Sequence, residues 1–271
     1  MQKQKLNFNL SASTINSYCS CPWAFKQDKL LKRKAIEIPS VALVSGQAFH
    51  KLMEAFYAKK VWRTYDLFQN WEKFFDIEAK AQNATKDPYL KYAKGSGFTM
   101  IKNWVTMAKE NKWLHEAYAF DNGQTGIETE FLLPYNNNRF EINVHGFMDL
   151  VIEVDGKIYI LDWKTGKHSE EKYKLQALIY SWAMYKKFGI VEDSVRFVHP
   201  SKKQNIIVDV VVRDTDYKIV AEKVDKLFDS IETDEFEKIE GTNCKWCKWI
   251  DCPANINSNL KELAKKVHDG E

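Results

Sequence analysis

Two acids and a lysine lie near the ends of two predicted strands that meet at Asp155-Gly156. An Asp-Gly pair between two runs of β-branched and aromatic residues predicts a tight hairpin, because a type I′ turn needs positive φ at both loop positions. With these two residues as the loop, paired positions have a constant index sum, which places Asp149 directly opposite Asp162. Lys164 follows two residues later and therefore projects from the same face.

These three side chains could bind a metal ion and act on an anionic substrate. Carboxylates about 5 Å apart on opposed strands repel each other. A divalent cation reverses that cost, because hard cations prefer carboxylate oxygens. A lysine beside the metal is suited to orienting a water molecule or stabilising an anionic transition state. The alternative is a pair of solvated acids on an exposed sheet face.

The five cysteines form a second constellation. Cys244, Cys247 and Cys252 lie close together near the C-terminus, and Cys19 and Cys21 lie near the N-terminus. A compact run of three thiolates needs a fourth ligand, and the remaining cysteines are at the other end of the chain. Metal chemistry alone allows either tetrahedral zinc or a cubane iron–sulfur cluster. In a reducing compartment these cysteines are better interpreted as ligands than as disulfides.

Two predicted helices would position further polar groups. Residues 46–60 carry apolar residues at helical spacing, and His50 falls at the edge of that stripe. A second helix follows the hairpin and ends at Gly189, a residue typical of helix ends. It places Gln176 and Tyr180 one turn apart on the same face.

Between His50 and the hairpin lies a long segment with a helical pattern, residues 62–117. It has a break at Asp87-Pro88 and a soft spot at Gly95-Ser-Gly97. We expect it to form a helical lobe inserted into the fold.

Other polar residues are ambiguous. Glu128 and Glu130 lie on a strand predicted over residues 127–133, where surface acids are commoner than metal ligands. Another strand is predicted over residues 139–144, and His145 after it is expected to be structural.

Composition bounds the function only loosely. The chain has 271 residues, 45% of them hydrophobic, which suits one large domain or a domain with an inserted lobe. A net charge of +3 gives no general case for nucleic-acid binding. The basic run over residues 26–34 could follow a phosphate backbone or form a solvated helix end. With no apolar run of membrane-spanning length and no signal peptide, we expect a soluble, cytoplasmic protein with no membrane partner.

The ordered series of motifs resembles the PD-(D/E)XK nuclease superfamily, and within it the RecB/AddB/Cas4-like branch with a four-cysteine iron–sulfur cluster. The residues that carry the resemblance are Gly146-Phe-Met-Asp149, Asp162-Trp-Lys164-Thr-Gly166, Gln176 and Tyr180. The resemblance implies an α/β (mixed α+β) fold with a restriction-endonuclease-like core. Its central mixed sheet would be flanked by helices, with an inserted helical lobe and an iron–sulfur clasp joining the N- and C-terminal segments.

One folded unit with four parts is expected on this basis. The parts are an N-terminal segment with a cluster cysteine and the histidine-bearing helix (1–60), the inserted helical lobe (61–120), the nuclease core (121–235), and the cysteine clasp and tail (236–271).

The resemblance also implies a metal site for Mg²⁺ or Mn²⁺. Its ligands would be His50, Asp149, Asp162 and the main-chain carbonyl of Trp163.

The same resemblance implies roles for the other catalytic residues, which with Asp149 and Asp162 complete the set. Lys164 would orient the nucleophile, and Gln176 would steady that lysine or a metal-bound water. Tyr180 would approach the DNA backbone.

The resemblance further implies a [4Fe-4S] cluster. Its ligands would be Cys21, Cys244, Cys247 and Cys252, because the N-terminal ligand in that branch is the cysteine before a proline, which here is Cys21 rather than Cys19. The last interval is four residues, where the branch leads us to expect about five.

The leading functional hypothesis is a metal-dependent DNA exonuclease that acts on single strands or DNA ends in recombination, repair or phage DNA processing. The first alternative is a CRISPR-adaptation Cas4 nuclease that processes prespacers with an integrase. The second is a non-catalytic iron–sulfur scaffold that binds DNA. DNA is the expected partner in each case, together with an integrase, a helicase or a recombination protein.

Overall fold

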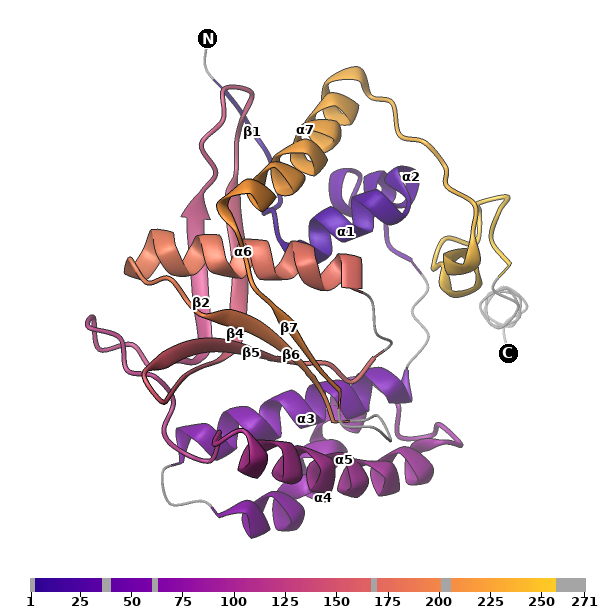
Figure 1. The fold of residues 1–271 in the computed structure, drawn as a ribbon. Helices are drawn as coiled ribbons and strands as arrows, with labels where there is room; N and C mark the ends of the chain where they lie inside the picture. Colours follow the sequence, from indigo (N-terminus) through magenta and orange to yellow (C-terminus); the bar gives the residue numbers. More distant parts are fainter. Residues whose placement is uncertain (1–2, 36–39, 60–62, 167–169, 201–205, 257–271) are drawn as a thin grey trace. The chain divides into compact units, whose positions relative to one another are not determined.

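The structure is a computed structural model that describes residues 3–35, 40–59, 63–166, 170–200 and 206–256 (Figure 1). The chain forms two compact units, each built from segments that are far apart in the sequence. The cysteine unit comprises Met1–Ile38, Pro134–Val144 and Lys218–Glu271, and the sheet unit comprises Pro39–Leu133 and His145–Tyr217.

The sheet unit is organised around five strands in the order β2-β4-β5-β6-β7. Neighbours β4 and β5 are antiparallel, β5 and β6 are parallel, and β6 and β7 are antiparallel, which confirms the expected mixed sheet. The strands are β2 (Ile127–Pro134), β4 (Asn143–Val154), β5 (Lys157–Trp163), β6 (Ser194–His199) and β7 (Ile206–Val210).

The β4–β5 hairpin has the predicted turn. Asp155 and Gly156 have φ values of 53° and 77°, the left-handed backbone that a type I′ turn requires. The ladder runs from the pair Val154–Lys157 to the pair Leu150–Leu161, which confirms the predicted register over these five pairs.

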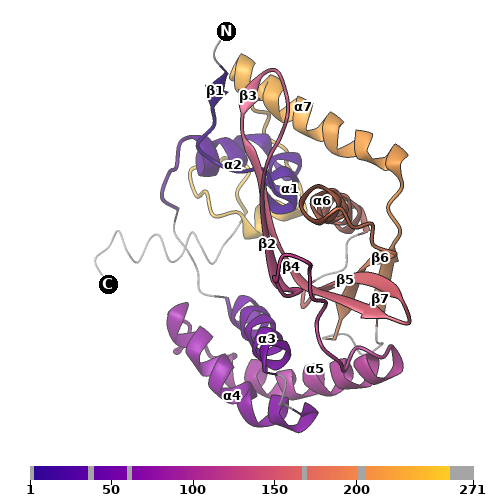
Figure 2. The same ribbon diagram turned by 90° about the vertical axis from the view of Figure 1, so that its left-hand side faces the viewer.

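Helices cover both faces of the sheet (Figures 1 and 2). Three of them pack on one face and form a hydrophobic core with Leu150, Leu161 and Trp163 of the strands. They are α3 (Val41–Ala58), α4 (Thr64–Ala81) and α5 (Leu90–Glu110), and the other face carries α6 (Glu170–Phe188). The expected inserted lobe therefore shares the core of the sheet unit. A short 3-10 turn, η2 (Asp214–Asp216), precedes the last helix.

The helical segment breaks where the sequence predicts and continues where it does not. Asp87-Pro88 lies between α4 and α5, whereas the expected soft spot at Gly95-Ser-Gly97 is continuous helix within α5. Gly97 allows close packing, because a Cβ there would overlap the ring of Trp71, which is completely buried.

The cysteine unit is mainly helical. It contains α1 (Ala12–Ser20), α2 (Pro22–Phe25), the π-helical turn η1 (Lys26–Leu30), α7 (Tyr217–Thr233, from Lys218 on) and the 3-10 turn η3 (Thr242–Trp246). The short strand β1 (Gln4–Lys5) pairs in parallel with β3 (Phe140–Glu141), so the strand expected over residues 139–144 is divided between β3 and the start of β4. The Tyr18 hydroxyl donates to the Lys226 carbonyl at 2.8 Å and fixes α1 against α7.

No helix in the described ranges combines the length and the apolarity that crossing a membrane requires.

Candidate active site

The predicted site residues of the sheet unit come from four elements. His50 lies on α3, Asp149 on β4, Asp162 on β5, and Gln176 and Tyr180 lie on α6. Although these positions span more than a hundred residues, the structure brings their polar atoms together around the end of the β4–β5 ladder.

The ladder ends one pair before the two acids. The next main-chain bond is replaced by a side chain, since the Trp163 N–H donates to Asp149 Oδ2 at 2.7 Å. Asp162 and Trp163 pair on their other side with β6. The prediction that Asp149 lies directly opposite Asp162 thus extends one position beyond the ladder, and the Asp149 carboxylate lies against the main chain beside Asp162.

His50 connects α3 to both strands. Its Nδ1 is 3.2 Å from Asp149 Oδ2, and its Nε2 is 2.9 Å from the Trp163 carbonyl oxygen. Burial alone would lower the pKa of His50, but the charge and hydrogen bond of Asp149, with the charges of Asp162 and Glu128, raise that pKa to about 9. Since both nitrogens face acceptor oxygens, both carry protons in the metal-free site.

Asp162 is buried, with 2% of its surface exposed, and both of its oxygens have neighbours. Lys164 Nζ lies 2.5 Å from Oδ1. Gln176 Nε2 and the Tyr180 hydroxyl donate to Oδ2 at 2.7 and 3.0 Å. Burial raises the pKa of Asp162, the charge of Lys164 opposes that rise, and the pKa stays above its ordinary value.

Lys164 is held from several sides. Gln176 Oε1 accepts a hydrogen bond from Nζ at 2.8 Å, and Nζ lies 5.4 Å from the ring centre of Phe197 and 5.9 Å from that of Tyr173. Its main-chain N–H donates to the Val198 carbonyl at 2.8 Å. The ammonium group is therefore aimed at Asp162.

Tyr180 occupies a different environment from the one expected by resemblance. Only 6% of its surface is exposed, and Gln176 Nε2 donates to its hydroxyl at 2.6 Å. Its described contact is with the Asp162 carboxylate, at a buried position, and the family's approach to a DNA backbone is not what this geometry displays.

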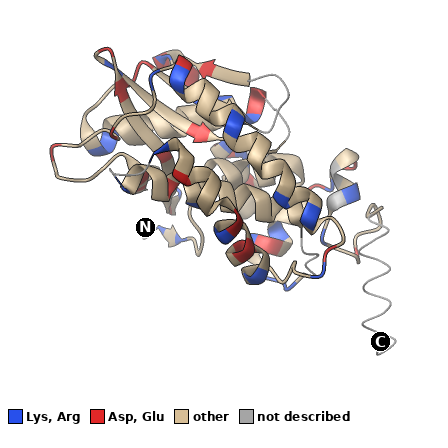
Figure 3. Cartoon of the chain, turned by 90° about the horizontal axis from the view of Figure 1, so that it is seen from below, with Lys and Arg blue, Asp and Glu red and all other residues tan. Residues whose placement is uncertain are grey.

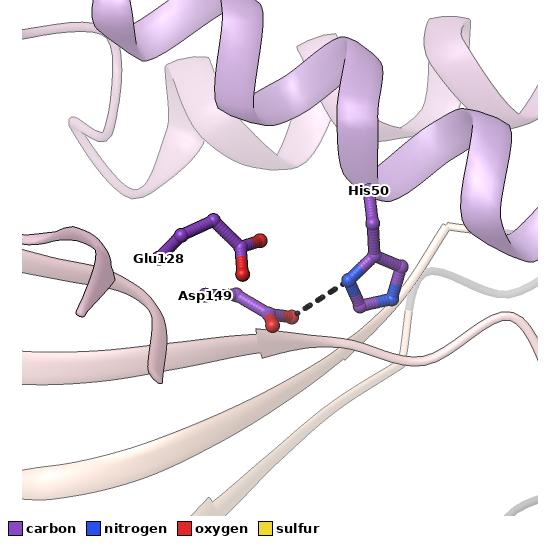
Figure 4. A group of neighbouring side chains, drawn as sticks. All are labelled: His50, Glu128 and Asp149. Atoms are coloured by element: carbon purple, nitrogen blue, oxygen red, sulfur yellow. Dashed lines mark ion pairs between the residues drawn. The ribbon is translucent and has the colours of Figure 1, made fainter. Parts of the chain in front are cut away.

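One acid at the site was not singled out by the sequence. Glu128, at the start of β2, lies beside His50 and Asp149, and one ligand atom from each of the three lies within 4.8 Å of the others (Figure 4). In the described part of the chain this is the one group of three or more such residues this close together. The signal would have been the pairing of β2 with β4, which the sequence does not reveal. Glu130 is exposed and 2.9 Å from His145 Nε2.

With this geometry described, similarity to known proteins can be stated. A family model described as PD-(D/E)XK nuclease superfamily matches residues 9–252. The chain belongs to the PD-(D/E)XK nuclease superfamily. Among curated relatives, the Gene 69 protein of Mycobacterium phage D29 is 27% identical over 196 residues, which cover 66% of this chain and 70% of that protein.

Two further proteins are similar to this PD-(D/E)XK nuclease. An ATP-dependent helicase/nuclease of Clostridium botulinum has one polypeptide that is 25% identical over 153 residues, which cover 53% of this chain but 12% of that polypeptide. A crystal structure described as a candidate exonuclease from Eubacterium rectale superposes with a TM-score of 0.52 at 13% identity, covering 90% of each chain. That second likeness concerns the fold.

The donor set of the nuclease suits a hard divalent cation. An imidazole, a main-chain carbonyl and the carboxylates of Asp149, Asp162 and Glu128 are the ligand types that Mg²⁺ and Mn²⁺ accept. Repulsion among the acids is compensated in the metal-free site only by His50 and Lys164. The residues present therefore fit such an ion.

The cysteines lie in the other unit. Burial raises the pKa of Cys247, a hydrogen bond from the Trp249 backbone opposes that rise, and the charges of Cys252, Cys21 and Cys244 raise it further, so these thiols are neighbours. Their sulfurs, within the described residues, do not form a group with all members within 4.8 Å, as one tetrahedral zinc would need. A cluster arrangement is not evident from the cysteines alone.

Cys19 has a separate environment. Its sulfur lies 3.9 Å from Lys223 Nζ, on the side of α1 that faces α7. It is absent from the charges that act on Cys247.

The basic run over residues 26–34 is largely paired within its own unit. Lys26 Nζ lies 2.8 Å from Asp234, and Arg33 Nη2 lies 2.9 Å from Asp251. Asp28 forms ion pairs with Lys29 and Lys248. Basic and acidic residues are also interspersed along the elements seen in Figure 3. The run is thus engaged mainly with local acids.

Proposed function

We propose that the chain is a divalent-metal-dependent DNA exonuclease that acts on single strands or DNA ends. The observation that carries this proposal is the convergence of His50, Asp149 and the Trp163 carbonyl beside Asp162 and Lys164. Such a site offers ligands for a cation and, next to them, an ammonium group directed at the same point.

Each residue has a defined part in phosphodiester hydrolysis. His50, Asp149, Asp162 and the Trp163 carbonyl would bind Mg²⁺ or Mn²⁺, which supplies a water of lowered pKa and neutralises phosphate charge. Lys164 orients the attacking water and donates a hydrogen bond to the developing negative charge. Gln176 and Tyr180 hold Asp162, and Gln176 also holds Lys164.

The relatives bear on the biological setting. Among them are a phage protein and a polypeptide of a helicase/nuclease, which supports a role in recombination, repair or phage DNA processing. No motif for ATP hydrolysis is present in the sequence, so a helicase or recombination protein would be a separate partner. Contacts mostly to phosphates would give little sequence specificity.

The test is degradation of DNA that is labelled at either the 5′ or the 3′ end, single- or double-stranded, with Mn²⁺ or Mg²⁺. We expect progressive shortening of linear DNA and no cleavage of closed circles. Asp162→Ala should abolish degradation, and Glu153→Gln, which changes an exposed acid of the same hairpin, should not. Cleavage that persists unchanged in Asp162→Ala would refute the site.

The same assay separates the alternatives. A DNA-binding scaffold without catalysis would bind end-labelled DNA equally well with and without Asp162 and would never shorten it. A prespacer-processing nuclease would cut at a fixed length only when an integrase is added.

We further propose that Cys21, Cys244, Cys247 and Cys252 hold a [4Fe-4S] cluster. Support comes from the proximity of these four thiols, with Cys19 directed instead at Lys223. Two ion pairs, Asp28–Lys248 and Arg33–Asp251, link the N-terminal helices to the cysteine-bearing loop of the same unit. A cluster at this point would close a loop of nearly the whole chain and stabilise the fold.

Anaerobic purification tests this second proposal. The protein should be brown, absorb near ~400 nm, and contain iron and acid-labile sulfide. Cys21→Ser should lose the absorbance and Cys19→Ser should keep it, a matched pair two residues apart. A colourless protein that contains one equivalent of zinc would refute the cluster.

A further inference from the structure

Glu128 is a third acid at the proposed centre. Figure 4 shows its carboxylate beside that of Asp149, with both facing His50. One ligand atom from each of these three residues lies within 4.8 Å of the others. The exonuclease mechanism proposed above does not use this acid.

The main chain fixes Glu128 at this point. Its φ is 43°, a left-handed conformation that few residues other than glycine adopt. The next residue, Thr129, is completely buried, and its hydroxyl donates to the Thr125 carbonyl at 3.2 Å. Just before it, the Gly126 carbonyl accepts a hydrogen bond from the Val151 N–H of β4 at 2.6 Å. The first turn of β2 is thereby held against β4, and the Glu128 side chain extends toward Asp149.

Glu128 has no partner of its own among the described residues. No hydrogen bond or ion pair joins it to another side chain, whereas Glu130 on the same strand has His145 at 2.9 Å. His50 cannot supply one, because Asp149 already occupies Nδ1 and the Trp163 carbonyl occupies Nε2. The imidazole has no N–H left to donate.

An acid placed beside another acid without a hydrogen-bond donor needs a cation to remain charged there. The adjacent exposed acid Glu54, one turn after His50 on α3, adds negative charge rather than relieving it. A divalent ion bound between His50 and Asp149 would compensate all of these charges.

We infer that Glu128 is a direct ligand of the divalent cation, completing a set of one imidazole and two carboxylates with His50 and Asp149. This inference rests on the proposed function. It gives the site three carboxylates with Asp162, more than the family resemblance assigns to it.

Metal binding measured without DNA tests the inference independently of nuclease activity. Free Mn²⁺ is followed by electron paramagnetic resonance during titration of the wild type, Glu128→Gln, Asp149→Asn and Glu130→Gln. We expect the dissociation constant to rise at least about tenfold in Glu128→Gln and in Asp149→Asn. Glu130→Gln should stay within about twofold, because that acid is bound to His145 away from the site.

Each outcome has one meaning. If Asp149→Asn loses Mn²⁺ and Glu128→Gln does not, the inference is wrong and the proposed metal site stands. If Asp149→Asn also binds Mn²⁺ with the wild-type affinity, the proposed metal site itself is wrong. Thermal unfolding without metal verifies that each variant folds. Should Glu128→Gln not fold, Glu128→Asp takes its place: the shorter side chain should also weaken Mn²⁺ binding, and wild-type affinity would overturn the inference.

Discussion

Gln176 accepts a hydrogen bond from Lys164 Nζ at 2.8 Å through Oε1, and its Nε2 donates to Asp162 Oδ2 at 2.7 Å. One amide on α6 therefore sets the position of the ammonium group relative to the acid on β5. The rings of Tyr173 and Phe197 restrict Lys164 further. The proposed orienting role of Lys164 depends on this arrangement, since the lysine has a flexible side chain with many rotamers.

Gln176→Leu should therefore lower turnover without removing the metal. A displacement of a reacting group by about 1 Å can cost about 10²-fold in rate, and we expect a loss of kcat of that order. The KM for DNA and the Mn²⁺ affinity should change by less than about threefold, because Gln176 contacts neither. Single-turnover degradation of end-labelled DNA measures the first quantity, and Mn²⁺ titration measures the last.

Lys186→Gln is the matched control on the same helix, since Lys186 is exposed and lies about three turns away. It should behave as the wild type. A Gln176→Leu variant with normal kcat would show that Lys164 is positioned without the amide.

Metal affinity should depend on pH through His50. The pKa of this histidine is raised to about 9 in the metal-free protein, so the ring is protonated on both nitrogens at neutral pH. A metal can bind only after one of these protons leaves, and affinity therefore rises with pH until about 9. Between pH 7.2 and 8.5 the apparent Mn²⁺ affinity should increase by about tenfold per pH unit, as expected for the release of one proton.

His50→Asn provides the control for that slope. It removes the titrating ring and should bind Mn²⁺ more weakly but with little dependence on pH over the same range. A wild-type affinity that is constant between these pH values would contradict a doubly protonated His50 in the metal-free site.

The parts of the site that follow from local sequence were predictable, and the parts that depend on strand order were not. The Asp155-Gly156 turn fixes its own register, so the positions of Leu150 and Leu161 could be derived by counting. Glu128 could not be placed in this way, because its proximity to Asp149 requires the pairing of β2 with β4 and an unusual backbone conformation.

The side-chain partners were also beyond the sequence. The helical spacing of Gln176 and Tyr180 predicts that both face one side, and both do meet Asp162. That spacing does not give the depth of the helix in the structure, and it is this depth that buries Tyr180. The contact of His50 with the Trp163 carbonyl likewise depends on how α3 packs across the ends of two strands.

Tyr180→Phe distinguishes a positioning role from a contact with DNA. In the structure the hydroxyl donates to Asp162 Oδ2 at 3.0 Å, and Gln176 still donates to the same oxygen when the hydroxyl is absent. Loss of one hydrogen bond to a charged group costs about 1.5–3 kcal/mol at most. We therefore expect kcat to fall by about tenfold while the KM for DNA is unchanged. A KM that rises with kcat constant would instead indicate that Tyr180 binds the DNA backbone.

A pair of glycines in α5 tests the packing that supports the site. A Cβ at Gly97 would overlap the ring of Trp71, which is completely buried and whose Nε1 donates to the Lys94 carbonyl at 2.8 Å. A Cβ at Gly95 would meet nothing within 4 Å. Alanine favours helix over glycine equally at both positions, so any difference between the variants reports the packing alone.

Gly95→Ala should raise the free energy of unfolding by about 0.5–1 kcal/mol. Gly97→Ala should lower it by about 1–3 kcal/mol, because the ring cannot move without breaking its hydrogen bond and leaving its pocket. Urea denaturation followed by tryptophan fluorescence measures both values. Equal stabilisation by the two substitutions would mean that α4 and α5 are not in close contact at Trp71, and the core that carries α3 and His50 would then differ from the one described.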